Sequence, residues 1–181
     1  MTLITRRNVL RIGGVGLALP LIGSLAFAQD GPLKIAFVNV GPKDDNGWTY
    51  GHWVGAQALE EEFGDQIEIT FVESVPEGPD CERVLRELAQ QGNKIIFATS
   101  FGFGDYVIKV AREFPDVIFE HATGYQRSEN VGTYNARFHE GRAVMGTLAG
   151  HLSQTKNIGY IGSFPIPEVV MGINAFELGA K

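Results

Sequence analysis

The loop at residues 41–50 holds side chains that could contact a small flat molecule. It contains Asp44, Asp45 and Trp48, and it follows an apolar run. An indole ring just before a helix can lie over the ends of strands as a platform, or it can cover the edge of the core. The carboxylate of Asp45 can orient the turn, or it can accept hydrogen bonds from a ring N–H or a sugar hydroxyl.

A second loop, residues 100–105, places two phenylalanines among glycines. Phe101 and Phe103 are costly to leave in water, so each must fold back onto the core or line a pocket. Gly102 lets a ligand approach the backbone closely. Together, Trp48 and Phe101 suggest a slot for a flat ring, where stacking contributes roughly 1–3 kcal/mol per base.

Catalytic patterns are weaker. The paired Asp44 and Asp45 could hold calcium or a nucleophilic water, so an enzyme is an alternative hypothesis to a binding protein. No phosphate-binding loop, nucleophile elbow or dinucleotide fingerprint occurs in the sequence, and we expect the four histidines on separate elements. We therefore predict no catalytic residue, no metal site and no cofactor. We expect the histidines at the surface or at helix ends, and the single cysteine, Cys81, as a small semi-buried residue.

Strands and helices alternate along the chain and must position these loops. Apolar runs predict strands at residues 33–40, 67–72, 94–99, 117–120 and 131–136. Helical spacing predicts helices between them, one capped by Asp80 and another opening at Asp105. This alternation predicts an α/β fold with a parallel sheet and helices on both faces. Ligands of such sheets bind outside the carboxyl ends of the strands.

The net charge of −6 is distributed unevenly. The first 28 residues contain three arginines and no acidic residue, so the remainder carries a net charge of −9. Such an acidic chain is unlike nucleic-acid-binding proteins. Residues 1–28 have the pattern of a twin-arginine export signal that is cleaved after Ala28. We therefore predict a periplasmic protein that has no lipid anchor and no stable membrane insertion.

The last part of the sequence has two further apolar elements. A strand is predicted at residues 157–162 and a helix from residue 167 to residue 181. The sequence stops within this helix, so we expect a fragment of a longer protein. Elements without sheet neighbours should leave apolar side chains exposed.

Several motifs, from about Leu33 to Lys181, follow one register. The chain resembles the basic membrane protein (PnrA-like) family of substrate-binding proteins of ABC importers. The motifs that carry the resemblance are Gly41-Pro42-x-x-Asp45-x-Gly47-Trp48, Thr99-Ser100-Phe101-Gly102-Phe103, the helix from Glu140 to Gly150, and Pro165-Ile166-Pro167-Glu168.

The resemblance implies a lobe like that of type I periplasmic binding proteins, joined by a hinge to a second lobe that is mostly missing here. Such proteins hold purine bases or nucleosides between aromatic rings and deliver them to ABC permease subunits. Many relatives have an aspartate where this chain has Glu120-His121, which favours a free base over a nucleoside. Carried over, the implied ligand-binding residues are Asp45, Trp48, Phe101, Gly102, Phe103, Asn135 and Asn174.

The resemblance also divides the chain. Residues 1–28 are the export signal, residues 29–136 the N-terminal ligand-binding lobe, and residues 137–181 the hinge crossover and the truncated start of the second lobe. One alternative to such a receptor is an enzyme that processes purine nucleosides with Asp44 and Asp45. A periplasmic sensor lobe that docks a signalling receptor is a further alternative, because it would use the same clamp.

Overall fold

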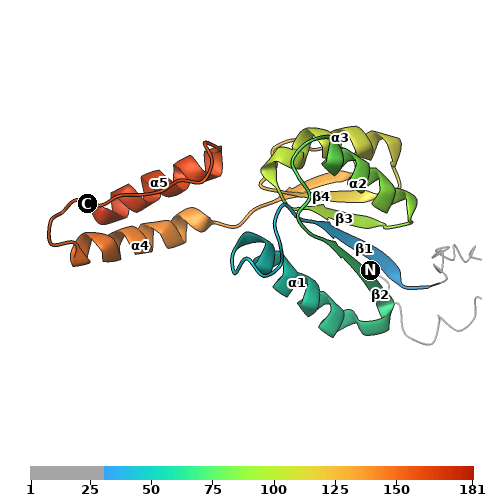
Figure 1. Cartoon of the computed structure of the whole chain (residues 1–181), viewed down its shortest axis with the longest axis horizontal. Helices are drawn as coiled ribbons and strands as arrows, with labels where there is room; N and C mark the ends of the chain where they lie inside the picture. The colour runs from blue at the N-terminus through green and yellow to red at the C-terminus, as the bar shows by residue number, and fades with distance from the viewer. Residues whose placement is uncertain (1–30) are drawn as a thin grey trace, which may run out of the picture. The chain divides into compact units, whose positions relative to one another are not determined.

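The computed structural model describes residues 31–181, and Figure 1 shows its helices and strands. The predicted export signal lies outside the described residues. The predicted alternation of strands and helices is confirmed. In chain order the elements are β1 (Leu33–Val38), α1 (Trp48–Phe63), β2 (Ile67–Val72), α2 (Pro79–Gln90), β3 (Ile95–Ala98), α3 (Gly104–Glu113), β4 (Ile118–Ala122), β5 (Val131–Tyr134), α4 (Phe138–Leu152) and α5 (Pro167–Ala180).

The strands form one parallel sheet in the order β2-β1-β3-β4-β5. Strand β1 pairs with β2 from Leu33↔Ile67 to Val38↔Val72, and its other edge pairs with β3. The chain moves outward from β1 to β2 and then returns to the opposite side of β1 as β3. The loops that follow β1 and β3 therefore diverge, and they leave a crevice at the carboxyl ends of these two strands.

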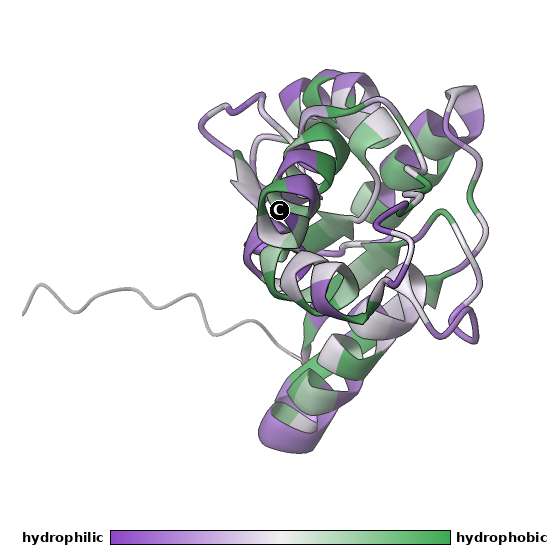
Figure 2. Cartoon of the chain, turned by 90° about the vertical axis from the view of Figure 1, so that its left-hand side faces the viewer, coloured by the Kyte–Doolittle hydropathy of each residue, from purple (hydrophilic) through white to green (hydrophobic). Residues whose placement is uncertain are grey.

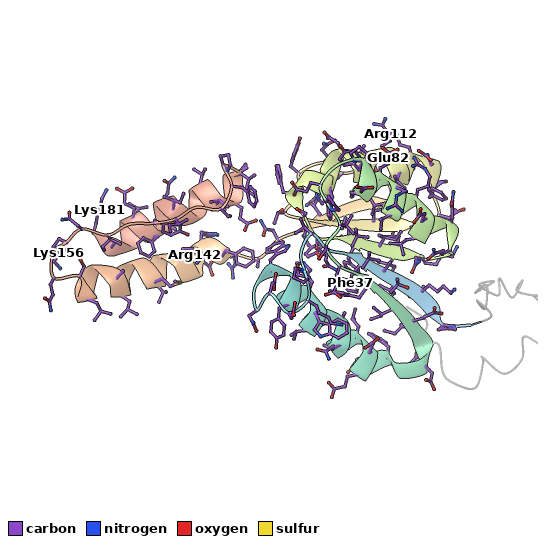
Figure 3. All side chains as sticks on the ribbon, viewed as in Figure 1. Phe37, Glu82, Arg112, Arg142, Lys156 and Lys181 are labelled. Carbon is purple, nitrogen blue, oxygen red and sulfur yellow. The ribbon has the colours of Figure 1, made fainter. Side chains whose placement is uncertain are left out.

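Helices cover both faces of the sheet, as predicted (Figure 1). The strands between the helix layers are largely hydrophobic (Figure 2). Helices α2 and α3 pack on the larger core cluster, which includes Leu85, Ile96, Phe103, Val107 and Phe119. On the other face, Phe37 stacks on Phe97 with ring centroids 4.6 Å apart and belongs to the cluster under α1 (Figure 3).

Charged side chains join α2 to α3 on the outer surface. Glu82, labelled in Figure 3, pairs with Arg86 of its own helix at 3.0 Å and with Lys109 of α3 at 2.7 Å. Arg86 also reaches Glu113 of α3 at 2.7 Å. Because these groups form a connected network, they fix the two helices relative to each other more firmly than an isolated surface pair would.

Glycines allow α4 and α5 to pack with their backbones in close contact. A Cβ atom at any of three glycines would collide with a carbonyl oxygen of the opposite helix, and the pairs are Gly146 with Phe176, Gly150 with Ala180, and Gly179 with Ala143. Because glycine has no side chain, the two helices can approach this closely.

The prediction of a strand at residues 157–162 is wrong, since this segment has no regular structure. A strand is stable only when a neighbour satisfies its backbone N–H and C=O groups, and the described sheet places no strand beside this segment. The expected exposure of apolar side chains is confirmed: Ile161 is 97% exposed, Leu178 73% and Val144 72%. Asp80 is not a cap either, because α2 begins at Pro79 after Gly78.

Candidate functional site

A cavity of about 400 Å³ lies between the loops that follow β1 and β3. This is the crevice that the strand order creates at the carboxyl ends of the sheet. Its wall combines aromatic rings, backbone groups and two acidic side chains. They come from the loops after β1, β2, β3 and β4, from the first residue of α1, and from residues 163–169. The bordering residues are Val40, Trp48, Glu77, Thr99, Ser100, Phe101, Gly102, Thr123, Ser163, Phe164, Pro165, Ile166, Glu168 and Val169.

Trp48, the first residue of α1, borders this cavity as the sequence suggested. Its indole N–H donates a hydrogen bond to the backbone carbonyl of Thr99 at 2.5 Å. Its ring centroid lies 5.0 Å from that of His52 and 6.0 Å from that of Phe138. It also borders a second cavity of about 630 Å³. The ring is therefore held in place before any ligand arrives, which lowers the entropic cost of binding.

The two phenylalanines of the loop after β3 lie in different environments. Phe101 borders the 400 Å³ cavity, and its ring centroid lies 6.0 Å from that of Tyr125. Phe103 is fully buried in the core cluster, so its ring is not available to a ligand. The sequence-based assignment of Phe103 to the site is therefore corrected. Phe101–Phe103 is a single 3₁₀ turn, and residues two apart in such a turn point in different directions.

A buried hydrogen-bond network fixes the strand ends beneath Trp48. The side-chain N–H of Asn39 donates to the carbonyl of Val72 at 3.1 Å, which ties β1 to β2. The hydroxyl of Thr99 lies 2.9 Å from Oδ1 of Asn39 and 3.2 Å from the carbonyl of Val38. Both Asn39 and Thr99 are fully buried. Since Thr99 also accepts the indole hydrogen bond, the network continues to the aromatic platform.

Asp45 is engaged with its own loop. Its carboxylate accepts hydrogen bonds from the backbone N–H groups of Gly47 at 2.7 Å, Thr49 at 3.0 Å and Tyr50 at 3.0 Å. Desolvation acts to raise the pKa of Asp45, but these hydrogen bonds outweigh it and hold the pKa below its usual value. Asp45 therefore orients the start of α1, and it borders none of the cavities described here.

Glu77 borders the cavity, although the sequence did not single it out. Its Oε1 accepts hydrogen bonds from the hydroxyl of Ser100 and, at 3.2 Å, from the backbone N–H of Gly102. The carboxylate occupies the place where a side chain on Gly102 would begin. Gly102 borders the cavity, and its lack of a side chain leaves room for the carboxylate of Glu77.

His121, near the end of β4, makes a hydrogen bond to the loop after β3. It is only 2% exposed, and its Nε2 lies 2.7 Å from the carbonyl of Ser100. Burial lowers its pKa, while hydrogen bonds to the backbone of Ser100 and Phe101 act in the opposite direction. The neutral ring with a proton on Nε2 fits this contact. The expectation that this histidine lies at the surface is wrong. The expectation that the four histidines lie on separate elements is also wrong, because His139 and His151 both belong to α4.

The two asparagines suggested by the family resemblance lie apart. Asn135 borders the 630 Å³ cavity, and its Oδ1 accepts the backbone N–H of Ala136 at 2.8 Å. Asn174 lies exposed in the middle of α5 and borders none of the described cavities. Glu168, at the start of α5, borders the 400 Å³ cavity, and burial raises its pKa.

Three further features concern residues 31–181. No group of three or more His, Cys, Asp or Glu side chains in this range is placed to hold a metal ion. Cys81 is fully buried, deeper than the sequence suggested, and burial raises the pKa of its thiol. None of the helices in this range is both long and apolar enough to cross a membrane.

Two curated relatives match most of this chain in sequence. A purine-binding protein of Brucella abortus is 52% identical over 161 residues, which are 89% of this chain and 46% of the relative. A putative ABC transporter glucose-binding protein of Haloferax volcanii is 42% identical over 149 residues, which are 82% of this chain and 38% of the relative. The chain thus spans less than half the length of both relatives.

Solved structures support the fold. An ABC transporter solute-binding protein from Aeropyrum pernix has a TM-score of 0.72 at 20% identity, over 82% of this chain and 43% of that protein. Another from Conexibacter woesei has a TM-score of 0.64 at 21% identity, over 81% of this chain and 49% of that protein. The family model for ABC transporter substrate-binding proteins of the PnrA-like type matches residues 33–181. This chain belongs to the PnrA-like family of ABC transporter substrate-binding proteins.

Proposed function

We propose that this chain is the N-terminal part of a periplasmic receptor that binds a purine and delivers it to the permease of an ABC importer. The observation that carries the proposal is the cavity at the carboxyl ends of β1 and β3, with Trp48 and Phe101 in its wall. The purine-binding relative at 52% identity supports the ligand class.

The chemistry of the cavity favours a purine over a sugar. The indole N–H of Trp48 already donates to Thr99, so the residue offers a ligand its ring rather than a hydrogen-bond donor. Stacking a base on such a ring contributes roughly 1–3 kcal/mol. A sugar needs several polar partners for its hydroxyls, whereas the backbone N–H of Gly102 and the hydroxyl of Ser100 are both used by Glu77.

A sugar nevertheless remains the second candidate, because the relative from Haloferax volcanii is named as a glucose-binding protein. Aromatic rings can also pack against the apolar face of a sugar. The enzyme hypothesis is less favoured, since it requires both Asp44 and Asp45 to act together. The carboxylate of Asp45 is committed to three backbone N–H groups of its own loop.

The proposal includes a second lobe. We assign residues 137–181 to the crossover and the first part of that lobe, because apolar side chains of α4 and α5 remain exposed and the relatives are more than twice as long as the matched region. Closure of two lobes buries a ligand between them. One lobe alone should therefore bind a purine weakly.

Titration of the chain with adenine, hypoxanthine, adenosine and glucose, followed by ¹⁵N–¹H NMR, tests the ligand class even at millimolar affinity. We expect saturable shifts at the Trp48 indole and the Gly102 amide with a purine but not with glucose. Saturable shifts with glucose but not with any purine would instead favour a sugar as the ligand.

The two-lobe account has its own test. A chimaera would join residues 33–181 to the remaining part of the Brucella abortus relative, and calorimetry would compare it with the chain alone. We expect the chimaera to bind far more tightly. Micromolar or tighter binding by the chain alone would contradict the need for a second lobe.

A further inference from the structure

The cavity beside Trp48 has an unbalanced set of charges. Two of the residues that border it, Glu77 and Glu168, are acidic. None of the residues that the structure places in its wall is a lysine, arginine or histidine. An anionic ligand would face two carboxylates with no cation to balance it, which disfavours a phosphate or carboxylate group on the ligand.

Two hydrogen-bond donors of the loop after β3 bind the same oxygen of Glu77, which leaves the other oxygen of this carboxylate free. The hydroxyl of Ser100 and the N–H of Gly102 both donate to Oε1 of Glu77. In the described structure no hydrogen bond reaches Oε2 of the same carboxylate. This oxygen can accept one hydrogen bond from a ligand, because a carboxylate oxygen has two lone pairs and no proton of its own.

Glu77 is also fixed in place. Two donors hold Oε1, and the absence of a side chain on Gly102 gives the carboxylate its room. Trp48 and Phe101 border the same cavity, so a flat ring packed against them would bring one of its edges within reach of Glu77. A carboxylate held beside an aromatic platform can recognise a stacked ligand by accepting a hydrogen bond from an N–H group on the edge of the ligand's ring.

We infer that Glu77 determines specificity by accepting a hydrogen bond from an N–H group of an uncharged purine, and that the cavity rejects nucleotides. This inference rests on the proposed function. It adds the residue that distinguishes one purine from another and the charge class of the ligand. The N–H group is either the exocyclic amino group or the ring N–H of the free base.

The test is an NMR titration of the full chain with four probes: adenine, 6-methylpurine, 9-methyladenine and adenosine monophosphate. The first analogue lacks the amino group, and the second lacks the ring N–H. We expect one analogue to bind the wild-type chain about tenfold more weakly than adenine, because a hydrogen bond to a charged group is lost. Adenosine monophosphate should produce no saturable shift.

The variant is Glu77→Gln, which keeps the size of the side chain and a carbonyl oxygen for Ser100 and Gly102. This change should lower the affinity for adenine about tenfold and leave the affinity for the weaker-binding analogue unchanged. Glu73→Gln is the matched control, because Glu73 precedes α2 in the same loop and does not border the cavity. This control should bind every probe like the wild type.

Each other outcome overturns a defined claim. An equal loss for all ligands in Glu77→Gln would assign Glu77 a purely structural role, and no change would remove it from recognition. Binding of adenosine monophosphate as tight as that of adenine would refute the charge argument. If no probe shifts the wild-type resonances while the spectrum shows a folded chain, both the proposed function and this inference fail.

Discussion

The network under Trp48 predicts a measurable cost for a nearly isosteric change, Thr99→Val. The hydroxyl of Thr99 carries one proton, which the carbonyl of Val38 and Oδ1 of Asn39 share. The change removes about one net hydrogen bond, worth about 0.5–1.5 kcal/mol, and leaves Oδ1 of Asn39 buried without this donor, which costs about 1–3 kcal/mol. The added methyl group recovers part of this loss.

We therefore expect the free energy of unfolding to fall by about 2 kcal/mol. For a described region of this size, that corresponds to a Tm lower by about 4–8 °C. Urea denaturation followed by circular dichroism measures the change. Thr70→Val is the control, because Thr70 lies in β2, is only partly buried and makes no side-chain hydrogen bond in the described structure.

A double-mutant cycle that combines Thr99→Val with Asn39→Ala measures the interaction energy between these two side chains. If the hydrogen bond between Thr99 and Asn39 matters, the two changes should be less costly together than the sum of the single changes. Additive effects, or a Thr99→Val chain as stable as the Thr70→Val control, would refute the view that this network holds the strand ends.

Three further predictions concern other parts of the chain. Because the pKa of Asp45 is lowered in the folded state, its contribution is present above the unfolded pKa and is lost as pH falls through the folded value. Asp45→Asn should therefore lower stability at pH 7 and flatten its decline in acid, measured by thermal melts from pH 7 to pH 2; an unchanged profile would contradict this. Gly146→Ala should destabilise the α4–α5 contact, whereas Gly141→Ala, where a Cβ meets nothing within 4 Å, should stabilise α4 by up to about 1 kcal/mol in urea denaturation. Equal effects would argue against close packing of the helices. Phe103→Ala should cost about 3–5 kcal/mol in the same assay because its ring is fully buried, and Phe101→Ala should cost much less. A larger loss of stability for Phe101→Ala than for Phe103→Ala would contradict the burial of Phe103 in the core.

Much of the fold was predictable from the sequence, because dense apolar runs and helical spacing each have a direct physical cause. In β1, Ala36 and Val38 belong to one core cluster whereas Ile35 and Phe37 belong to the other. This strand is therefore buried on both faces of the sheet, which favours a continuous apolar run. The segment at residues 157–162 also contains apolar residues and yet forms no strand. Strand pairing depends on a neighbour, and local sequence does not show whether one is present.

The site was predictable only in part. The loops after β1 and β3 were identified because parallel strands bring their carboxyl ends together. The separation of Phe101 from Phe103 could not be read from composition, since it depends on a single 3₁₀ turn. Glu77 and His121 were missed because their roles arise from contacts with Ser100, which lies more than twenty residues away from each in sequence.

The central claim is that a purine stacks on the ring of Trp48. NMR titration of adenine into Trp48→Ala, with Tyr50→Ala as the control, tests it most directly through the amide of Gly102. Tyr50 lies on the same helix, is 45% exposed and borders none of the described cavities. We expect Tyr50→Ala to bind like the wild type and Trp48→Ala to lose about tenfold or more in affinity, since about 1.4 kcal/mol of stacking corresponds to a factor of ten. Equal affinity in Trp48→Ala and the wild type would contradict the account.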